Sequence, residues 1–545
     1  MLSIMAVFKF FIPLFALLLL TSGCQSKSAH SRKLNKQFLD SKTLRISFNS
    51  DVSSLDPRIG VDYPSAHVTM MLFEGLMIAG LDGGIKPGIA KSYDLSSDHK
   101  TYTFYLRPTY WSNGDPVTAF DFEYAWKRVI DPYQNGLGKQ NFYVIKNARQ
   151  IVKGELPLSE VGIKALDEST LRIELEYPVP YFLELVATSS YLPVNASWDQ
   201  ALPNWSNKQN EDFVCNGPYR LVKHALESEI IVEKNPTYWN ASEVRMEKIH
   251  ISIINDLTTQ LNLFEKKQLD WLGNPFSRIA FDASESLKKN NLLEFAETLG
   301  LYWLEINTES FPFNNKKLRQ AFAYAIDRRK LTSYLLQSNE SPATGVLPPG
   351  IATQSIPFFK DGDKETALRL FNEALSEMGI TRKDLPIITL CHSQMFDISS
   401  VMQEIQEQLN STFSIHIQLE QQDFKTLLAK LQKGNYQIAA LGWKSWIRDP
   451  IYILQTFRDK SDALNGTKWE NPRYQQLLAA AEREIDPEKR QHYFNQAEQI
   501  LIEEMPVIPL YYTTNSFCKN KRLKNVHMTN LDQVDFRWAY FEEDK

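Results

Sequence analysis

The sequence predicts a mixed α/β protein with at least two lobes. Alternating strand patterns and longer helical patterns are interleaved along the chain, which is typical of the α/β and α+β classes. The chain has 545 residues, more than one compact domain usually holds. Its composition, 43% hydrophobic and 23% charged, is that of an ordinary globular protein.

The first half of the folded part combines strands with capped helices. Apolar and polar residues alternate in TLRISFN (residues 43–49) and in YTFYLR (residues 102–107), which predicts two strands. A helix is expected over residues 65–77, where apolar residues recur on one side. Thr118 and Asp121 have the spacing of a capping box, so a second helix is expected to begin there.

The second half is richer in long helices. Further strands are expected over residues 230–233, 248–254 and 415–419. Helical patterns cover residues 315–336, 401–409 and 471–504, with a break in the last at Pro487. Pro506 should end that helix, and Pro509 should lead into a short strand at Tyr511 and Tyr512.

The N-terminus has the layout of a secretory signal peptide. A positive charge precedes the apolar run FFIPLFALLLL at residues 10–20, which is shorter than the ~20 residues that span a bilayer. Small residues then lead to Cys24, which resembles a bacterial lipobox, although Leu20 lies one position further from the cysteine than usual. We expect a signal peptide over residues 1–23, a lipid on Cys24 and a flexible tether over residues 24–41. An uncleaved anchor or an ordinary signal peptide is the alternative.

Charge and cysteine content exclude several classes of partner and site. A formal net charge of −5 is slight for this length and gives no reason to expect nucleic acid as a partner. The four cysteines contain no C-x-x-C pair, so neither a structural zinc site nor a thioredoxin-type motif is indicated. If Cys24 carries lipid, Cys215, Cys391 and Cys518 remain, and at most one disulfide can form among them.

Sequence motifs for catalysis or cofactor binding are absent. The chain contains no H-E-x-x-H, no G-x-S-x-G and no P-loop motif, and its nine histidines lack metal-ligand spacing. We therefore expect no metal, no cofactor and no enzymatic activity. A triad assembled from distant positions would escape such a search, so a secreted hydrolase stays an alternative.

A collinear series of segments resembles one family of binding proteins. Residues 102–132 read YTFYLRPTYWSNGDPVTAFDFEYAWKRVIDP, which is similar to the signature segment of one family. Other segments agree with the same family in order: SLDP and LFEGL before it, and NGPYRL, NPTYWN, LYWLEIN, LRQAFAYAIDR, GW followed by DP, and PLYY after it. Together they are similar to the peptide- and nickel-type (family 5) solute-binding proteins of bacterial ABC importers, and specifically to the oligopeptide-binding branch. The likeness covers nearly everything after residue 42.

The resemblance implies the fold of a periplasmic binding protein, in which two lobes close on a ligand like a hinge. Lobe I is then discontinuous, with residues 42–73, 199–298 and 514–545. An inserted domain covers residues 74–198, and lobe II covers residues 299–513. The family lays an extended peptide in the cleft between the lobes, where its backbone pairs with strand edges.

The same resemblance implies partners and a location. The expected ligand is an oligopeptide, and the expected partners are an ABC permease with its ATPases and the membrane that holds the N-terminal lipid. We expect a monomer at the periplasmic face of a bacterial membrane. Further alternatives are a receptor for a muropeptide, a sugar or a nickel chelate, and a surface adhesin or chaperone that kept the fold.

The family's charged ligand anchors do not transfer to this chain. Its peptide binders usually read G-W-x-x-D-Y-x-[DE]-P, and this chain reads GWKSWIRDP, so the amine-binding Asp falls on Trp446. The places of two basic residues that hold the ligand carboxylate contain Ala440 and Leu431. The family's frequent cysteine pair falls on Gly300 and Lys444, so that disulfide is absent.

An aromatic floor remains, and it is the expected ligand-contacting set together with three residues after the Gly-Trp pair. The floor comprises Tyr63, Tyr302, Trp303, Trp443 and Tyr512. Trp446, Arg448 and Asp449 complete the set, and Asp449 could equally serve in capping or hinge support. Either Arg448 or Asp449 has taken over an anchor, or the ligand lacks a free amine, as in a cell-wall peptide capped by sugar.

Overall fold

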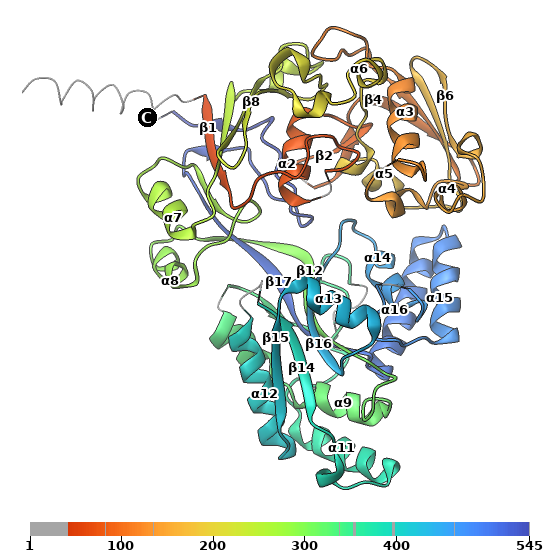
Figure 1. Cartoon of the computed structure of the whole chain (residues 1–545), viewed down its shortest axis with the longest axis vertical. Helices are drawn as coiled ribbons and strands as arrows, with labels where there is room; N and C mark the ends of the chain where they lie inside the picture. Colours follow the sequence, from red (N-terminus) through yellow and green to blue (C-terminus); the bar gives the residue numbers. More distant parts are fainter. Residues whose placement is uncertain are drawn as a thin grey trace, which may run out of the picture. The chain divides into compact units, whose positions relative to one another are not determined.

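The computed structural model describes residues 42–543 except 61, 82, 135, 337, 353–355, 395–397 and 463. The expected signal peptide, Cys24 and the tether over residues 24–41 lie outside the described residues. Strands and helices are interleaved along the whole described chain, so the predicted mixed α/β class is confirmed (Figure 1).

Three larger sheets organise the chain. The first has the order β1-β10-β9-β8, the second β4-β5-β7-β6, and the seven-stranded third β11-β17-β12-β16-β14-β15 with β13 beside β17. The strands of the first are β1 Thr43–Phe48, β8 Tyr219–Ala225, β9 Glu229–Lys234 and β10 Lys248–Ile253; those of the second are β4 Ala90–Leu95, β5 Thr101–Leu106, β6 Ile163–Asp167 and β7 Thr170–Glu174. The third contains β11 Trp271–Gly273, β12 Glu294–Ile306, β13 Ser341–Pro342, β14 Ile388–Ser393, β15 Ile417–Gln422, β16 Ile438–Lys444 and β17 Val507–Lys519.

The third sheet is mixed, because β14 runs parallel to β15 and β16 while β12 is antiparallel to both β16 and β17. Two small antiparallel pairs complete the strands: β2 Met77–Ala79 with β3 Ile85–Pro87, and β18 Leu523–Lys524 with β19 Tyr540–Phe541.

Helices cover the sheets. In the first half they are α2 Tyr63–Leu72, α3 Ala119–Ile130, α4 Ala148–Val152, α5 Phe182–Leu185, α6 Ala196–Ala201, α7 Leu257–Glu265 and α8 Phe281–Lys289. In the second half they are α9 Lys316–Ala325, α10 Arg328–Lys330, α11 Lys364–Met378, α12 Ser399–Phe413, α13 Phe424–Lys433, α14 Ile451–Leu454, α15 Pro472–Arg483 and α16 Pro487–Glu504. Helix α3 packs on β6 and β7, while α12 packs on β15 and α13 on β14.

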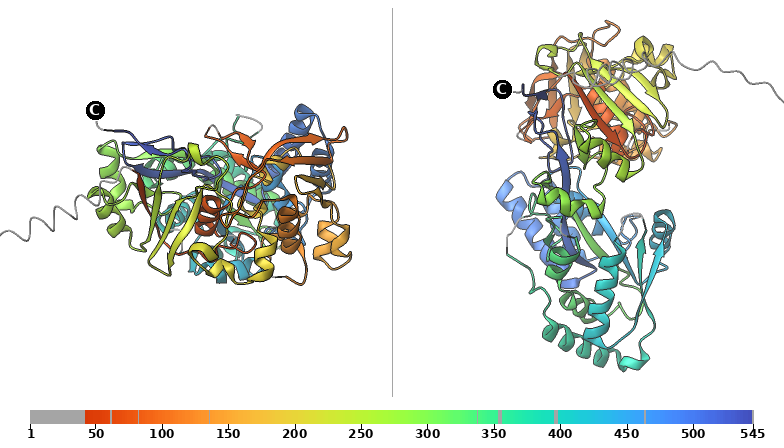
Figure 2. Two further views of the ribbon diagram at one scale, coloured as in Figure 1. Left: turned by 90° about the horizontal axis from the view of Figure 1, so that it is seen from above. Right: turned by 90° about the vertical axis from the view of Figure 1, so that its left-hand side faces the viewer.

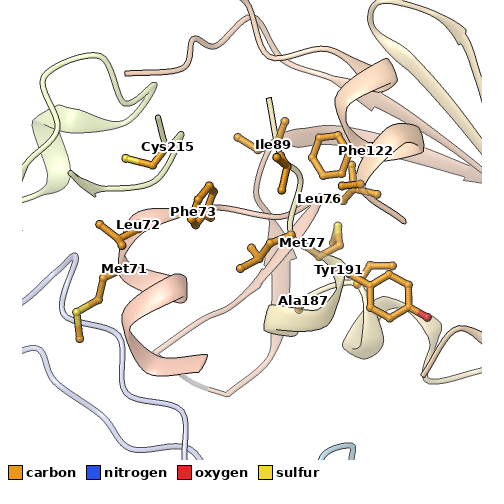
Figure 3. Close-up of a cluster of buried hydrophobic side chains, with 14 of the residues drawn as sticks. Met71, Leu72, Phe73, Leu76, Met77, Ile89, Phe122, Ala187, Tyr191 and Cys215 are labelled. Carbon is orange, nitrogen blue, oxygen red and sulfur yellow. The ribbon is translucent and has the colours of Figure 1, made fainter. Parts of the chain in front are cut away.

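Buried apolar side chains gather in two large cores. The first core joins β1, α2, the β4–β7 sheet and β8–β10 with Phe517 and Phe536 near the C-terminus, and the blue C-terminal segment lies against the red and yellow-green strands in Figures 1 and 2. The second core joins β12, β14, β16 and the first half of β17 with α9, α11, α12, α15 and α16. Part of the first core is drawn in Figure 3, whose labelled side chains include Leu72 and Phe73 at the end of α2, Ile89 before β4 and Phe122 in α3.

Most sequence-predicted elements are present, and three of those that differ in extent have a local cause. The helix expected over residues 65–77 ends at Leu72, because the Glu74 N–H binds Asn216 Oδ1 at 3.0 Å and the chain leaves to form β2. The helix expected over residues 315–336 breaks at Asp327, whose carboxylate caps a new turn at the Lys330 N–H. The strand expected at Tyr511 and Tyr512 is the thirteen-residue β17, which accommodates Pro509 at a shift in its register with β12.

The three described cysteines, Cys215, Cys391 and Cys518, are buried free thiols. Among the described residues, no three histidine, cysteine, aspartate or glutamate side chains converge as a metal site. A search of the same residues finds no helix with the length and apolar character needed to cross a membrane.

Candidate ligand cleft beside two long strands

Two long antiparallel strands connect the cores. Strands β12 and β17 have thirteen residues each and pair along much of their length. Residues at one end, such as Phe517, belong to the first core, whereas Leu304 and Ile508 belong to the second. A side chain near the middle of these strands therefore lies between the two cores.

The pairing of β12 with β17 is irregular at this midpoint. Its register shifts between Glu297 and Leu301, and the Thr298 and Thr513 hydroxyls approach to 2.7 Å beside the shift. A Cβ on Gly300 would lie 2.4 Å from Thr513 Oγ1, so the close approach requires a glycine there. Such irregularities bend a strand, so a bend in the two strands lies between the cores.

A pocket of about 500 Å³ opens at the same place. Thr298, Tyr512 and Thr513 from the two long strands line it, together with Asn530 from the C-terminal segment and Arg329 from α10. Most of the lining side chains carry a hydroxyl, amide or charged group. The pocket therefore offers many hydrogen-bonding groups to a polar ligand.

Strand β16 presents an open edge next to β12. It pairs with β12 along its full length, from Ile438 to Lys444, but its ladder with β14 contains only Ile438 and Ala439. Residues 441–444 thus have no strand on their far side in the part of the chain that the structure describes. Unpaired backbone N–H and C=O groups at a sheet edge can pair with another extended segment.

The predicted aromatic floor is divided between the two faces of this sheet. Tyr302 is paired with Tyr511, and their rings stack at 5.5 Å on one face, against Gly442. Trp303 and Trp443 stack at 5.8 Å on the opposite face. Tyr512 shares this second face, because it pairs with Leu301, which is also the partner of Trp443.

These aromatic side chains differ in accessibility. Trp303 is fully buried and also contacts Phe457 edge-on, and Tyr302 is 7% exposed. Trp443 and Tyr512 are half-buried, and the Tyr512 hydroxyl donates to the Gly345 carbonyl at 3.2 Å. The Trp443 Nε1–H has no hydrogen-bond acceptor among the described residues. Of the aromatic residues on the third sheet, Trp443 and Tyr512 are therefore the better placed to touch a ligand.

Trp446 and Tyr63 meet across the cores. Trp446 follows β16 and is 39% exposed, and its ring stacks on Tyr63 at 4.8 Å. Tyr63 begins α2, whose first turn is capped by the Asp62 carboxylate at the Ser65 N–H. Burial, and next the charge of Asp532, raises the pKa of the Tyr63 phenol well above its usual value. The pair forms an aromatic wall at the end of β16.

Arg448 and Asp449 already have partners within the chain. The Arg448 backbone N–H donates to Glu184 Oε2 at 2.7 Å, and its Nε donates to Asn530 Oδ1 at 3.0 Å. Asp449 is 5% exposed and accepts from both terminal nitrogens of Arg490, at 2.5 and 2.9 Å. The Asp449 carboxylate thus fastens α16 to the chain before α14, so the structure places it in support of the second core.

Sequence reasoning missed the charged residues that surround this wall. Lys444 forms an ion pair with Asp532, and Asn515 Nδ2 donates to the same carboxylate at 2.6 Å. Asp532 and Lys444 are far apart in the chain, so no local sequence pattern indicates that they pair. Lys444 was notable in the sequence for occupying a family cysteine position, and it lies directly opposite Gly300, as that alignment requires.

Comparison with known proteins finds relatives over most of the chain. Residues 84–465 match the model of the bacterial extracellular solute-binding proteins, family 5 middle region. The chain belongs to this family. It is 36% identical to the oligopeptide-binding protein OppA of Bacillus subtilis, over 92% of this chain and 93% of that protein.

Solved structures of this family resemble the chain over most of its length. The OppA of Haemophilus influenzae in complex with the peptide RPPGFSPFR has a TM-score of 0.76 at 26% identity, and 92% of this chain and 99% of that chain are covered. The murein tripeptide binding protein MppA of Escherichia coli has a TM-score of 0.78 at 26% identity, and 93% of this chain and 99% of that chain are covered.

Proposed function

We propose that this protein captures extended oligopeptides beside β16 and delivers them to the permease of an ABC importer. The open edge at residues 441–444 carries the proposal, since it lies next to the strands that connect the two cores. An extended peptide that joins this edge satisfies its own backbone groups and those of β16, whatever its sequence. The family membership and the peptide-binding relatives support the same ligand class.

The surroundings of the edge suit a ligand of variable sequence. The half-buried Trp443 and Tyr512 offer flat contact surfaces, and the pocket beside Thr298 and Thr513 is polar and about 500 Å³ in volume. Water and hydroxyl groups in such a pocket adapt to different side chains at little cost. We therefore propose weak sequence selectivity.

We propose that the protein acts by binding and not by catalysis. Three carboxylates near the wall of Tyr63 and Trp446 are held by the chain itself: Glu184 by the Arg448 N–H, Asp449 by Arg490 and Asp532 by Lys444. A carboxylate that is held in this way is poorly suited to act as a general base, because proton uptake would break the interaction.

We propose two lobes that close on the ligand. Lobe I comprises residues 42–73, 199–298 and 514–545 and carries the insert 74–198, while lobe II comprises residues 299–513. The two buried cores support this division, since the first draws mainly on the former segments and the second on the latter. The irregular pairing at Gly300 and Thr513 is the proposed hinge.

We also propose that the mature protein is held at the outer face of a bacterial membrane by lipid on Cys24. The short apolar run before this cysteine supports the proposal. Substitution of Cys24→Ala should release soluble protein or leave an unprocessed precursor, as judged by fractionation and intact mass. Normal processing with normal membrane retention would contradict the lipid anchor.

A second candidate ligand is a peptide whose amine is blocked, such as a cell-wall peptide. Trp446 favours it, because an aromatic ring stacked on Tyr63 stands where an acid would be needed for an ammonium group. A buried ammonium without an anionic partner costs several kcal/mol. The relative MppA is a murein tripeptide binding protein, which supports a cell-wall peptide as ligand.

Calorimetry with ligand-stripped protein tests the proposed function. A pool of short peptides should give saturable heat at one site per chain, whereas a mixture of free amino acids should give none. Trp443→Ala should weaken peptide binding at least tenfold, because it removes a contact surface beside the open edge. Tyr133→Ala is the matched control, since Tyr133 is 91% exposed on the inserted segment and should leave binding unchanged. Absence of peptide heat would refute the proposal.

A further inference from the structure

The ion pair of Lys444 with Asp532 lies beside the proposed cleft. Lys444 is the last residue of β16 and its side chain is 28% exposed, whereas the Asp532 side chain is 5% exposed. The pair joins the second core, through β16, to the turn between Met528 and Val534, which belong to the first core. The cation is therefore the accessible member, and the carboxylate is the buried one.

Asp532 is held firmly in this position. One of its carboxylate oxygens accepts from Asn515 Nδ2 at 2.6 Å, and the other accepts from Lys444. Its N–H donates to the Thr529 carbonyl at 3.0 Å, within a turn that is closed by a bridge between Met528 and Val534. The carboxylate would stay in place if the lysine were removed.

The ion pair lies near the first turns of α2, and Lys444 precedes Trp446 of the aromatic wall by two residues. The Asp532 charge reaches the phenol of Tyr63, where it adds to burial in raising the pKa. The Lys444 charge reaches His67, one turn later in α2, where it adds to burial in lowering the pKa to about 4. Both members of the pair are thus close to the end of the open edge that Trp446 closes.

Other acids near this wall are already bound. Glu184 accepts the Arg448 N–H, and Asp449 accepts the Arg490 guanidinium. Asp449 is buried within the second core, and Arg490 is only 8% exposed, so a ligand cannot displace that cation easily. Asp532 differs, because the side chain of its cation, Lys444, is 28% exposed.

We infer that the Lys444–Asp532 pair makes the Trp446 end of the cleft electrically neutral and thereby selects ligands whose end at this position is uncharged. The inference rests on the proposed function. The lysine ammonium occupies the place that a ligand ammonium would take on Asp532, and the aspartate cancels the charge that a ligand carboxylate would seek. A charged ligand end gains no partner here and loses water against two aromatic rings.

Three forms of one short peptide test this inference by calorimetry: one blocked at both ends, one with a free amine alone and one with a free carboxylate alone. The native protein should bind the blocked form at least as tightly as either charged form. Lys444→Met leaves an unpaired carboxylate, and Asp532→Asn leaves an unpaired ammonium. For the charged form whose end lies at Trp446, the ratio of its affinity to that of the blocked form should change by at least tenfold in each variant. Lys444→Met should raise this ratio for a free amine and lower it for a free carboxylate, and Asp532→Asn should do the reverse.

Two further variants keep the result interpretable. Lys444→Arg preserves the charge pair and should preserve the native preference. The double variant Lys444→Met with Asp532→Asn is neutral again and should also restore it, and thermal melting shows that each variant is folded. Folded single variants with the native preference would overturn the inference while leaving peptide binding intact. If no peptide form binds to any of these proteins, the proposed function itself fails, and the inference with it.

Discussion

At the scale of single residues, several polar groups around the proposed cleft already have partners within the chain. The sequence predicted the aromatic positions and the absence of the family's acid at Trp446. It did not show that Tyr302 and Trp303 point to opposite faces of β12, although their adjacency in a strand implies it. The pairing of Lys444 with Asp532 could not be predicted from the sequence, because it depends on how the C-terminal segment returns to β16.

Glu305 gives a pH-dependent prediction. It is 1% exposed on β12, its Oε2 has no hydrogen-bond donor within the described chain, and burial raises its pKa from 4.5 to about 8. Folding therefore favours the protonated form. The resulting stabilisation is complete below pH 4.5 and is lost as the pH rises towards 8, at up to about 1.4 kcal/mol per pH unit.

Substitution of Glu305→Gln should remove this contribution, since the amide does not titrate. Urea unfolding at a series of pH values should show that the variant loses less stability than the native protein between pH 5 and pH 8. The difference between the two proteins isolates Glu305 from Glu498, whose burial raises its pKa to about 7. Parallel pH profiles would show that Glu305 is ionised in the fold.

The stack of Tyr63 on Trp446 gives a second prediction at this scale. The rings lie 4.8 Å apart and belong to elements of different cores, so they should stabilise each other directly. A double-mutant cycle of Tyr63→Ala and Trp446→Ala should give a coupling free energy of about 0.5–1.5 kcal/mol in urea unfolding. Additive effects of the two substitutions would mean that the rings do not interact in solution.

At the scale of elements, local signals predicted the starts of helices better than their ends. The capping box was confirmed, because the Thr118 N–H donates to Asp121 Oδ2 at 2.8 Å and α3 begins at Ala119. The long pattern over residues 315–336 kept its apolar spacing through a real break, since the new cap at Asp327 does not disturb the periodicity. Tertiary contacts cause that break, and hydrophobic periodicity contains no information about them.

The irregular pairing of β12 with β17 gives a prediction for one element. Gly300→Ala places a Cβ 2.4 Å from Thr513 Oγ1, so the Thr513 side chain or the two strands must shift, and the cost in unfolding free energy should be about 1–3 kcal/mol. Thr513→Ala should relieve this clash when it is combined with Gly300→Ala. A double-mutant cycle measured by urea unfolding checks the coupling, and a Gly300→Ala variant of native stability would contradict the close approach.

At the scale of the whole molecule, the family resemblance carried most of the correct prediction. The interleaved strand and helix patterns predicted the α/β class. The order of the family-like segments predicted the family, because an entire fold constrains their spacing. The lobe boundaries and the hinge remain proposals. The two cores and the irregular pairing between them give a physical basis for these proposals.

Hinge closure is the prediction that belongs to this scale. A peptide that contacts both lobes should favour the closed state by the difference in its affinity for the two states. Small-angle scattering should therefore show a smaller radius of gyration at saturating peptide, together with a change in tryptophan fluorescence. Free amino acids at the same concentration serve as the control. An unchanged radius at saturation would argue against closure.

The central claim is that this chain holds peptides along the open edge of β16. The most direct measurement is mass spectrometry of the molecules that ligand-stripped protein retains from a pool of short peptides, after washing and release by denaturation. The account predicts peptides of varied sequence at about one per chain, with retention strongly reduced in Trp443→Ala and unchanged in Tyr133→Ala. Retention of no peptide, or of equal amounts by all three proteins, would contradict it.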